Sequence, residues 1–202
     1  MIAEVEKSIK PNKPTPRDPV DKRSKSGGRS SGLNAAISVC SSAGIKVVSV
    51  RPEWIELRVP CALRSIEPLQ QLLLQFEADL PRDAGDAINY AFREMVSNAM
   101  EYGGQLDPRK WVEVRFIRLK HALICRIKDP GKGFDPARLE HAAINNPSDD
   151  PIGHAFVRAK RGLRPGGFGI LLTSQLVDEL VYNQRHNEVL FVKYLSSGEG
   201  AI

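Results

Sequence analysis

A carboxylate and a carboxamide lie one helical turn apart in residues 93–99. Glu94 and Asn98 are four residues apart, so they share a face if this segment is helical. Apolar residues around them recur three and four positions apart, which predicts a helix over about 83–102 with the pair beside its buried stripe. A carboxylate there can accept a proton, and an amide oxygen can bind a hard cation such as Mg²⁺. The same spacing is also common at ordinary solvated helix edges.

A glycine loop over residues 129–134 follows directly after a predicted strand. Asp129, at the end of the strand, can accept the exocyclic amino proton of adenine, whereas guanine shows a carbonyl at that place. Gly131 and Gly133 let the backbone approach a base closely because no Cβ intervenes, and Phe134 completes the block. Asp-Pro-Gly is also a good turn sequence, so the block alone indicates either a turn or a binding loop.

A second glycine segment, with Gly166, Gly167 and Gly169, begins a predicted helix over 167–181. The free N–H groups at a helix N-terminus favour phosphate. A glycine hinge after a long loop explains the same residues equally well. Taken together, however, a carboxylate base, a metal-binding amide and two glycine loops are most of what is needed to hold Mg-ATP.

Hydrophobic periodicity predicts the elements that would position these groups. Alternating residues predict five strands, over 45–50, 53–59, 111–119, 122–128 and 188–195. Ser65 is a candidate N-cap for a further helix, which ends at Pro81. Residues 135–166 lack sustained periodicity and contain four prolines, so we expect a long mobile loop there, with at most one short helix. This pattern indicates an α+β sandwich, with one antiparallel-rich sheet covered by helices.

Composition and cysteine usage exclude several classes of protein. A chain of 202 residues holds one ordinary domain, and 42% hydrophobic residues fit a soluble globular protein. The sequence contains neither an apolar run long enough to cross a membrane nor an N-terminal hydrophobic signal segment. Its three cysteines are scattered and odd in number, which argues against a disulfide framework or a zinc site. We therefore expect a cytoplasmic protein.

The net charge of +5 is concentrated at the N-terminus. Residues 1–32 contain eight Lys or Arg and four acidic residues, while the rest of the chain contains 21 basic and 20 acidic residues. The N-terminal segment is also rich in Pro, Ser and Gly, which predicts a disordered basic leader over residues 1–34. Because the folded part is nearly neutral, we expect it to bind neither nucleic acid nor a membrane directly.

The three blocks, in this order and in these contexts, resemble the N, G1 and G2 boxes of the gyrase, chaperone, histidine kinase and MutL (GHKL) ATPase superfamily, over about 45–195. Residues 98–103 and 169–179 are most similar to the anti-sigma-factor serine/threonine kinases. The resemblance implies a Bergerat-type two-layer α/β sandwich with a mixed, mainly antiparallel sheet and helices on one face. It also implies a histidine-kinase-like ATP-binding domain over 35–202, with a mobile lid over about 135–166.

The resemblance also implies roles for individual residues, with ATP and Mg²⁺ as cofactors. Asn98 would coordinate Mg²⁺, and Glu94 would act as the base on an attacking hydroxyl. Asp129 would hold adenine, and the residues that would pack against base and phosphates are Gly131, Gly133, Phe134, Gly167 and Gly169. Arg164, with Arg161, would reach phosphate or a partner from the end of the lid. The sequence departs from the family pattern at Tyr102, where many relatives have histidine, and at Pro130, which stiffens the G1 loop.

The phosphoryl acceptor is expected on another protein. All four histidines lie downstream of the first block, which argues against the autophosphorylation of histidine kinases. Few residues follow the last predicted strand, so we do not expect a second domain to supply the lysine that gyrase-like and MutL-like enzymes use. The resemblance then implies phosphorylation of a serine on an anti-anti-sigma partner, competition with a sigma factor, and a homodimer. Two alternatives remain: a non-catalytic ATP-gated interaction module, and a kinase in a sigma-independent partner-switching circuit.

Overall fold

The computed structural model describes residues 26–163 and 165–195, in which six strands form one sheet of order β1-β2-β3-β4-β6-β5. Every neighbouring pair is antiparallel. The sheet is therefore antiparallel throughout, whereas a mixed, mainly antiparallel sheet was expected. The strands are β1 (Lys46–Arg51), β2 (Trp54–Pro60), β3 (Trp111–Arg118), β4 (Ala122–Lys128), β5 (Glu179–Tyr182) and β6 (Glu188–Tyr194). The five strands predicted from alternation are confirmed to within about one residue, and β5 is additional.

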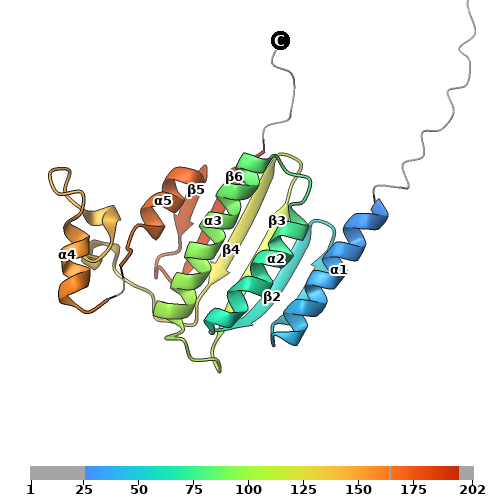
Figure 1. Ribbon diagram of the computed structural model, residues 1–202, viewed down its shortest axis with the longest axis horizontal. Helices are drawn as coiled ribbons and strands as arrows, with labels where there is room; N and C mark the ends of the chain where they lie inside the picture. The colour runs from blue at the N-terminus through green and yellow to red at the C-terminus, as the bar shows by residue number, and fades with distance from the viewer. Residues whose placement is uncertain (1–25, 164, 196–202) are drawn as a thin grey trace, which may run out of the picture.

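Helices cover one face of this sheet, as Figure 1 shows, and make the protein a two-layer α+β sandwich. In order across the sheet they are α1 (Ser26–Ser42), α2 (Ile66–Phe76), α3 (Arg82–Asn98) and α5 (Gly169–Leu176). The predicted lid contains the helix α4 (Gly153–Lys160), which lies to the side of the sandwich beyond α5, and two 3₁₀ turns, η3 (Pro136–Arg138) and η4 (Ala143–Asn145). Within the described residues, no helix is long and apolar enough to cross a membrane.

The core lies between the sheet and these helices. Alternate residues of β2, namely Ile55, Leu57 and Val59, are fully buried. Helix α3 contributes the stripe predicted from its 3.6-residue period, and Phe92 of that stripe packs on Phe116 of β3 with ring centroids 5.1 Å apart. Burial of this stripe fixes how α3 is rotated about its axis. Residues of α3 that lie beside the buried stripe therefore point sideways over the sheet, not into the core.

The N-terminal boundary of the fold differs from the prediction. Residues 26–34, which composition assigned to a disordered leader, form the first half of α1. Ala36 and Cys40 of this helix are buried, and Leu33 and Ile37 pack against the core. Burial of this apolar side against α2 outweighs the low helix propensity of the Ser/Gly-rich segment, as tertiary packing often does. The rest of the predicted leader, residues 1–25, lies outside the described residues.

Two predicted helices have different ends in the structure. The helix predicted over 167–181 ends at Leu176 in the structure. The last residues of the predicted helix belong instead to β5. The backbone N–H of Asp178 donates to the carbonyl of Val192 in β6 (2.9 Å), and antiparallel pairing with β6 continues from there. An apolar run cannot reveal such a change from helix to strand. Helix α2 follows a 3₁₀ turn, η1 (Leu63–Ser65), and ends before Pro81; Ser65 makes no side-chain cap, and its buried Oγ has no partner among the described residues.

Glu77, at the end of α2, is a buried carboxylate in the contact with α3. It is only 5% exposed; its Oε1 accepts a hydrogen bond from Asn89, and its Oε2 has no partner among the described residues. Burial raises the pKa of Glu77 from 4.5 to about 8. Between these values the folded protein keeps a proton that the unfolded chain releases, so stability falls as pH rises from about 4.5 to about 8.

We therefore expect Glu77→Gln to flatten this pH dependence. The variant keeps an acceptor for Asn89 without a charge, and its advantage in unfolding free energy should grow from pH 5 to pH 8, by up to about 1.4 kcal/mol per pH unit. Urea unfolding at several pH values measures this, with the exposed Glu67→Gln as the matched control. If the unfolding free energies of the wild type and of Glu77→Gln changed with pH in parallel, a buried ionisable Glu77 would be contradicted.

Candidate nucleotide-binding site

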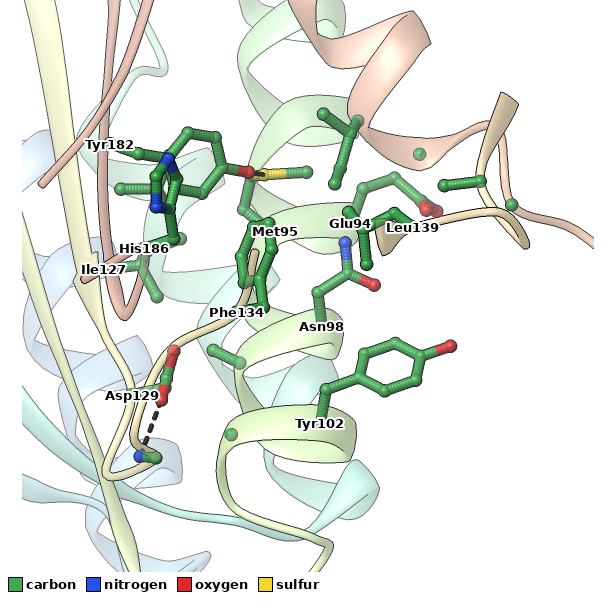
Figure 2. Close-up of a pocket in the computed structure, with 18 of the residues that line it drawn as sticks. Glu94, Met95, Asn98, Tyr102, Ile127, Asp129, Phe134, Leu139, Tyr182 and His186 are labelled. Carbon is green, nitrogen blue, oxygen red and sulfur yellow. Dashed lines mark hydrogen bonds between the residues drawn. The ribbon is translucent and has the colours of Figure 1, made fainter. Parts of the chain in front are cut away.

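The three sequence blocks meet around one cavity of about 530 Å³, a size typical of small-molecule sites. It lies between the second half of α3, the end of β4, the lid and the start of α5. Eight predicted site residues line it: Glu94, Asn98, Asp129, Gly131, Gly133, Phe134, Gly167 and Gly169. The ninth, Arg164, lies outside the described residues. In Figure 2, Asp129 and Glu94 lie at opposite sides of the cavity with Asn98 between them.

Asp129 is held in a glycine cradle at one end of the cavity. Its Oδ1 accepts a hydrogen bond from the backbone N–H of Gly131 (2.6 Å), and its own N–H donates to the carbonyl of Asn187 (2.9 Å). Helix α3 widens into a π-turn, η2 (Ala99–Gly103), which brings Gly103 so close that a Cβ there would lie 2.3 Å from Asp129 Cγ. Burial raises the pKa of Asp129, and the hydrogen bond from Gly131 opposes that shift. A half-buried carboxylate among bare backbone fits the recognition of a flat base.

The G1 loop is fastened to the loop between β5 and β6. The side-chain amide of Asn187 donates to the carbonyl of Gly131 (3.2 Å), and its backbone N–H donates to Oδ1 of Asn183 (3.1 Å). Gly133 has φ +87°, and a Cβ there would lie 1.6 Å from the carbonyl oxygen of Arg185. Only glycine fits this position, because both the backbone conformation and the space exclude a side chain.

An aromatic cluster forms the wall beside this loop. Phe134 packs edge-on against Tyr182 (5.6 Å between centroids) and lies 5.3 Å from the ring of His186. Tyr182 donates its hydroxyl to Sδ of Met95 (3.5 Å), which Figure 2 shows, and its burial raises its pKa to about 12. These apolar surfaces suit the faces of a purine ring.

Glu94 and Asn98 lie on α3 toward the other end of the cavity (Figure 2). A Cβ at Gly169 would lie 2.4 Å from Oε2 of Glu94, so this carboxylate is against the backbone that begins α5. Within the described part of the chain, nothing forms a hydrogen bond or ion pair with Glu94 or with the Asn98 side chain. Both groups are therefore available to a ligand at the end where the second glycine segment lies.

The lid closes this end of the cavity. The backbone N–H of Ala143 donates to the carbonyl of Gly167 (2.9 Å), and Gly167 itself has φ +97°. Six residues of the lid line the cavity: Leu139, His141, Ala142, Arg158, Pro165 and Gly166. Arg161, in contrast, is outside the cavity lining and pairs on the surface with Glu140 (2.6 Å).

Several lining residues were not predicted from the sequence. Asn187 and His186 come from a polar loop between strands, and Tyr182 from just beyond the helix predicted over 167–181. His141 and Arg158 come from the aperiodic lid. None carries a local spacing signal, because each reaches the cavity only through tertiary packing.

Asn98 fits a Mg²⁺ site of the kind found with nucleotides. Among residues 26–163 and 165–195, no three His, Cys, Asp or Glu side chains converge to hold a metal ion. Mg²⁺ in nucleotide sites is typically held by one or two protein groups together with phosphate oxygens and water. A single amide oxygen facing the phosphate end therefore suffices on the protein side.

The sequence matches the histidine kinase-like ATPase domain over residues 59–193, about two thirds of its length, and the chain belongs to that family of GHKL-type ATPases. A comparison with curated proteins finds no match. The matched range contains all three sequence blocks and every residue that lines the cavity. The protein therefore has the ATP-binding, kinase-like function of this family.

We expect Gly169→Ala to impair catalysis more than folding. The added Cβ meets the flexible end of Glu94 rather than backbone, so the fold can accommodate it by moving that carboxylate. A displacement of about 1 Å in a reacting group can lower the rate about 100-fold. Thermal unfolding should change little while ATP turnover falls, and Gly85→Ala, where a Cβ would make only an ordinary contact with Glu77 (3.7 Å to Oε1), controls for an added methyl group elsewhere in the chain. Unchanged turnover would show that Glu94 does not need its present position.

Proposed function

We propose that this protein is an ATP-dependent serine/threonine kinase of the anti-sigma-factor type. It would phosphorylate a serine of an anti-anti-sigma partner and bind a sigma factor in a partner-switching circuit. The observation that carries this proposal is the position of Glu94, whose carboxylate lies against Gly169 at the phosphate end and one helical turn from Asn98. A carboxylate so placed can deprotonate a hydroxyl that enters beside the phosphates.

The proposed reaction transfers one phosphoryl group. As the serine oxygen bonds to the γ-phosphorus, Glu94 accepts the hydroxyl proton, the bond to the β,γ-bridging oxygen breaks, and ADP leaves. Asn98 would hold Mg²⁺, which supplies neutralisation of the charge on the phosphate oxygens. Asp129 orients the adenine, and the lid residues keep water from the reacting end. Positioning and electrostatics of this kind supply most of the rate enhancement in phosphoryl transfer.

The histidines of the chain support an acceptor other than histidine. Of the four in the sequence, only His154 lies in a helix, and it is 1% exposed. His121 lies in the turn between β3 and β4, and the other two line the nucleotide cavity. Histidine kinases carry their phosphoacceptor histidine on a helix, and none of these four is both helical and exposed. A hydroxyl on another protein therefore fits this chain better.

The test is transfer from ATP labelled on its γ-phosphate, in Mg²⁺, to a purified serine-bearing single-domain protein encoded beside this one. The proposal predicts label on one serine of that partner, equimolar ADP, and a complex with a sigma factor that the unphosphorylated partner disrupts. Light scattering in the same experiments would show the proposed homodimer. ATP binding without transfer to any candidate would refute the kinase.

A non-catalytic ATP-gated interaction module is the second candidate. It is favoured by the lid helix α4, which exposes Phe156 (70%), with Ile152 (56%) exposed at its N-cap, while its other side packs toward Gly167 and Phe168. Exposed apolar residues on a nucleotide-contacting lid could bind a protein only in one nucleotide state. In that case Glu94→Gln would leave ATP-dependent partner binding unchanged.

A further inference from the structure

The seam between α3 and α5 forms a groove that starts at the phosphate end of the nucleotide cavity. The two helices lie side by side (Figure 1) and run in opposite directions. Gly169, at the start of α5, lies against Glu94, whereas Leu176, at the end of α5, lines a second hollow together with Ala87 of α3. The seam therefore connects the nucleotide cavity with this second hollow.

An apolar strip of α5 follows the seam. Leu172 lines the nucleotide cavity and Leu176, one helical turn later, lines the second hollow. Each leaves more than a third of its surface exposed (36% and 37%), whereas Thr173, on the side of α5 that faces the core, is fully buried. The strip thus begins in the nucleotide site and remains accessible to a ligand from solvent.

Tyr90 lies on the α3 side of the groove, one helical turn before Glu94. Within the part of the chain that the structure describes, its hydroxyl has no hydrogen-bond partner. Burial, and then the negative charge of Glu94, raise the pKa of Tyr90, so the hydroxyl keeps its proton and can donate beside the proposed base. Asp129 lies against Gly103 at the other end of α3, so Tyr90 extends the wall away from the adenine end.

The far end of the groove carries a negative charge without a partner. Asp178 and Lys193, which both line the second hollow, pair with each other (3.1 Å), and Asp86 pairs with Arg82 (3.7 Å). Asp83, in the first turn of α3, lines the same hollow, is exposed, and forms no hydrogen bond or ion pair with any residue that the structure describes. A basic side chain of a ligand would complement this carboxylate.

The length of the groove suits a short extended segment of polypeptide. Along α3, Asp83 and Glu94 are about 16 Å apart at a rise of about 1.5 Å per residue. An extended chain covers that distance in about five residues. A serine placed at Glu94 would therefore put the residue about five positions away beside Asp83, with the intervening residues over the apolar strip.

We propose that the groove between α3 and α5 binds the acceptor segment of the protein substrate. The segment is extended, places its serine at Glu94, and lays apolar side chains on Leu172 and Leu176. It carries a Lys or Arg at Asp83, and Tyr90 donates a hydrogen bond to its backbone. This inference rests on the proposed function and names the substrate class of the same site: an acceptor sequence with apolar residues between the serine and a basic residue.

The probe is a set of fluorescein-labelled peptides, each with one serine, leucines beside it, and Lys, Ala or Glu five positions away, made in both chain directions. Fluorescence anisotropy is measured with Mg²⁺ and adenylyl-imidodiphosphate, which cannot transfer its terminal phosphate. In one direction the Lys peptide should bind up to about 5-fold more tightly than the Ala peptide, as for an exposed ion pair, and the Glu peptide should bind most weakly. Asp83→Asn should remove this ranking, and Glu67→Gln, an exposed carboxylate on α2, should preserve it.

Leu176→Gln tests the apolar strip. The substitution keeps the size of the side chain and lies outside the lining of the nucleotide cavity, so calorimetry with adenylyl-imidodiphosphate should show unchanged affinity. Because the peptide would cover about a third of a leucine surface at this position, binding of the leucine peptides should weaken about 2- to 5-fold. Leu74→Gln, an exposed leucine of α2, is the matched control and should bind them normally.

Three results would overturn the assignment. They are equal binding of the Lys, Ala and Glu peptides, no binding of any peptide, and a homodimer that Leu176→Gln dissociates in light scattering, which would give the groove to a second copy of this chain. If the variants unfold, the ranking of the peptides on wild-type protein decides the same question. With ATP in place of the analogue, ranked binding without transfer would refute the kinase and leave the groove intact. Transfer to a protein partner without any ranking of the peptides would refute the groove and leave the kinase.

Discussion

Asp129→Asn should remove most of the preference of this protein for ATP over GTP. The hydrogen bond from Gly131 N–H to Asp129 Oδ1 forces an asparagine to place its oxygen there, so its NH₂ group faces the ligand. That group opposes the amino group of adenine, but it can donate to the carbonyl of guanine. Loss of a buried hydrogen bond to a charged group lowers affinity about 10- to 100-fold, and the clash of two donors adds to that loss.

Calorimetry with ATP and GTP on the same preparations measures this change. We expect ATP to bind more weakly and the ratio of ATP to GTP affinity to fall by a larger factor than the ATP affinity itself. Asp149→Asn, an exposed carboxylate on the lid, is the matched control and should bind both nucleotides normally. An equal loss for both nucleotides would mean that Asp129 only supports the loop.

Glu94→Gln should abolish phosphoryl transfer while ATP binding survives. A positioned base typically contributes about 10²- to 10⁴-fold to a rate, and glutamine cannot accept the proton. Affinity for ATP should stay the same or rise, because a negative charge is removed from the neighbourhood of the phosphates. Single-turnover transfer and calorimetry on one preparation separate the two effects.

The controls for Glu94→Gln are a distant carboxylate and a neighbouring amide. Glu67→Gln changes an exposed residue of α2 and should be neutral. Asn98→Ala should weaken the Mg²⁺ dependence of nucleotide binding, which Glu94→Gln should leave intact. Normal transfer in Glu94→Gln would remove the base from the proposed mechanism and leave the family's ATP binding untouched.

Much of the fold was predictable because its strands are amphipathic. Ile55, Leu57 and Val59 alternate with exposed or half-buried residues, and the alternation is visible without any structure. Residues 177–181 were assigned to the wrong element, since an apolar run has the same pattern in a buried helix end and in a strand. Helix α1 was missed because its Ser/Gly-rich start looks unfoldable until α2 is present to pack against it.

Part of the site could also be predicted, since some residues carry their signal locally. Glu94 and Asn98 share a helix face, and Asp129 is followed by two glycines. The Asp129 carboxylate leaves no room for a side chain at the first glycine, and Arg185 leaves none at the second. Arg158, His141 and Asn187 have no such signal, although they line the same cavity. Their place depends on how the lid and the loop between β5 and β6 pack against the glycine segments.

The amino-acid sequence alone determined which chemical groups this protein offers a nucleotide: a base, an amide, an adenine-matching carboxylate and two flexible glycine segments. It did so because helix and strand periods are local properties. Tertiary structure decided that these groups surround one cavity, that Glu94 meets Gly169 and that a buried lid arginine joins them. Contacts between residues tens of positions apart form only when the core and lid pack, and no local pattern records them.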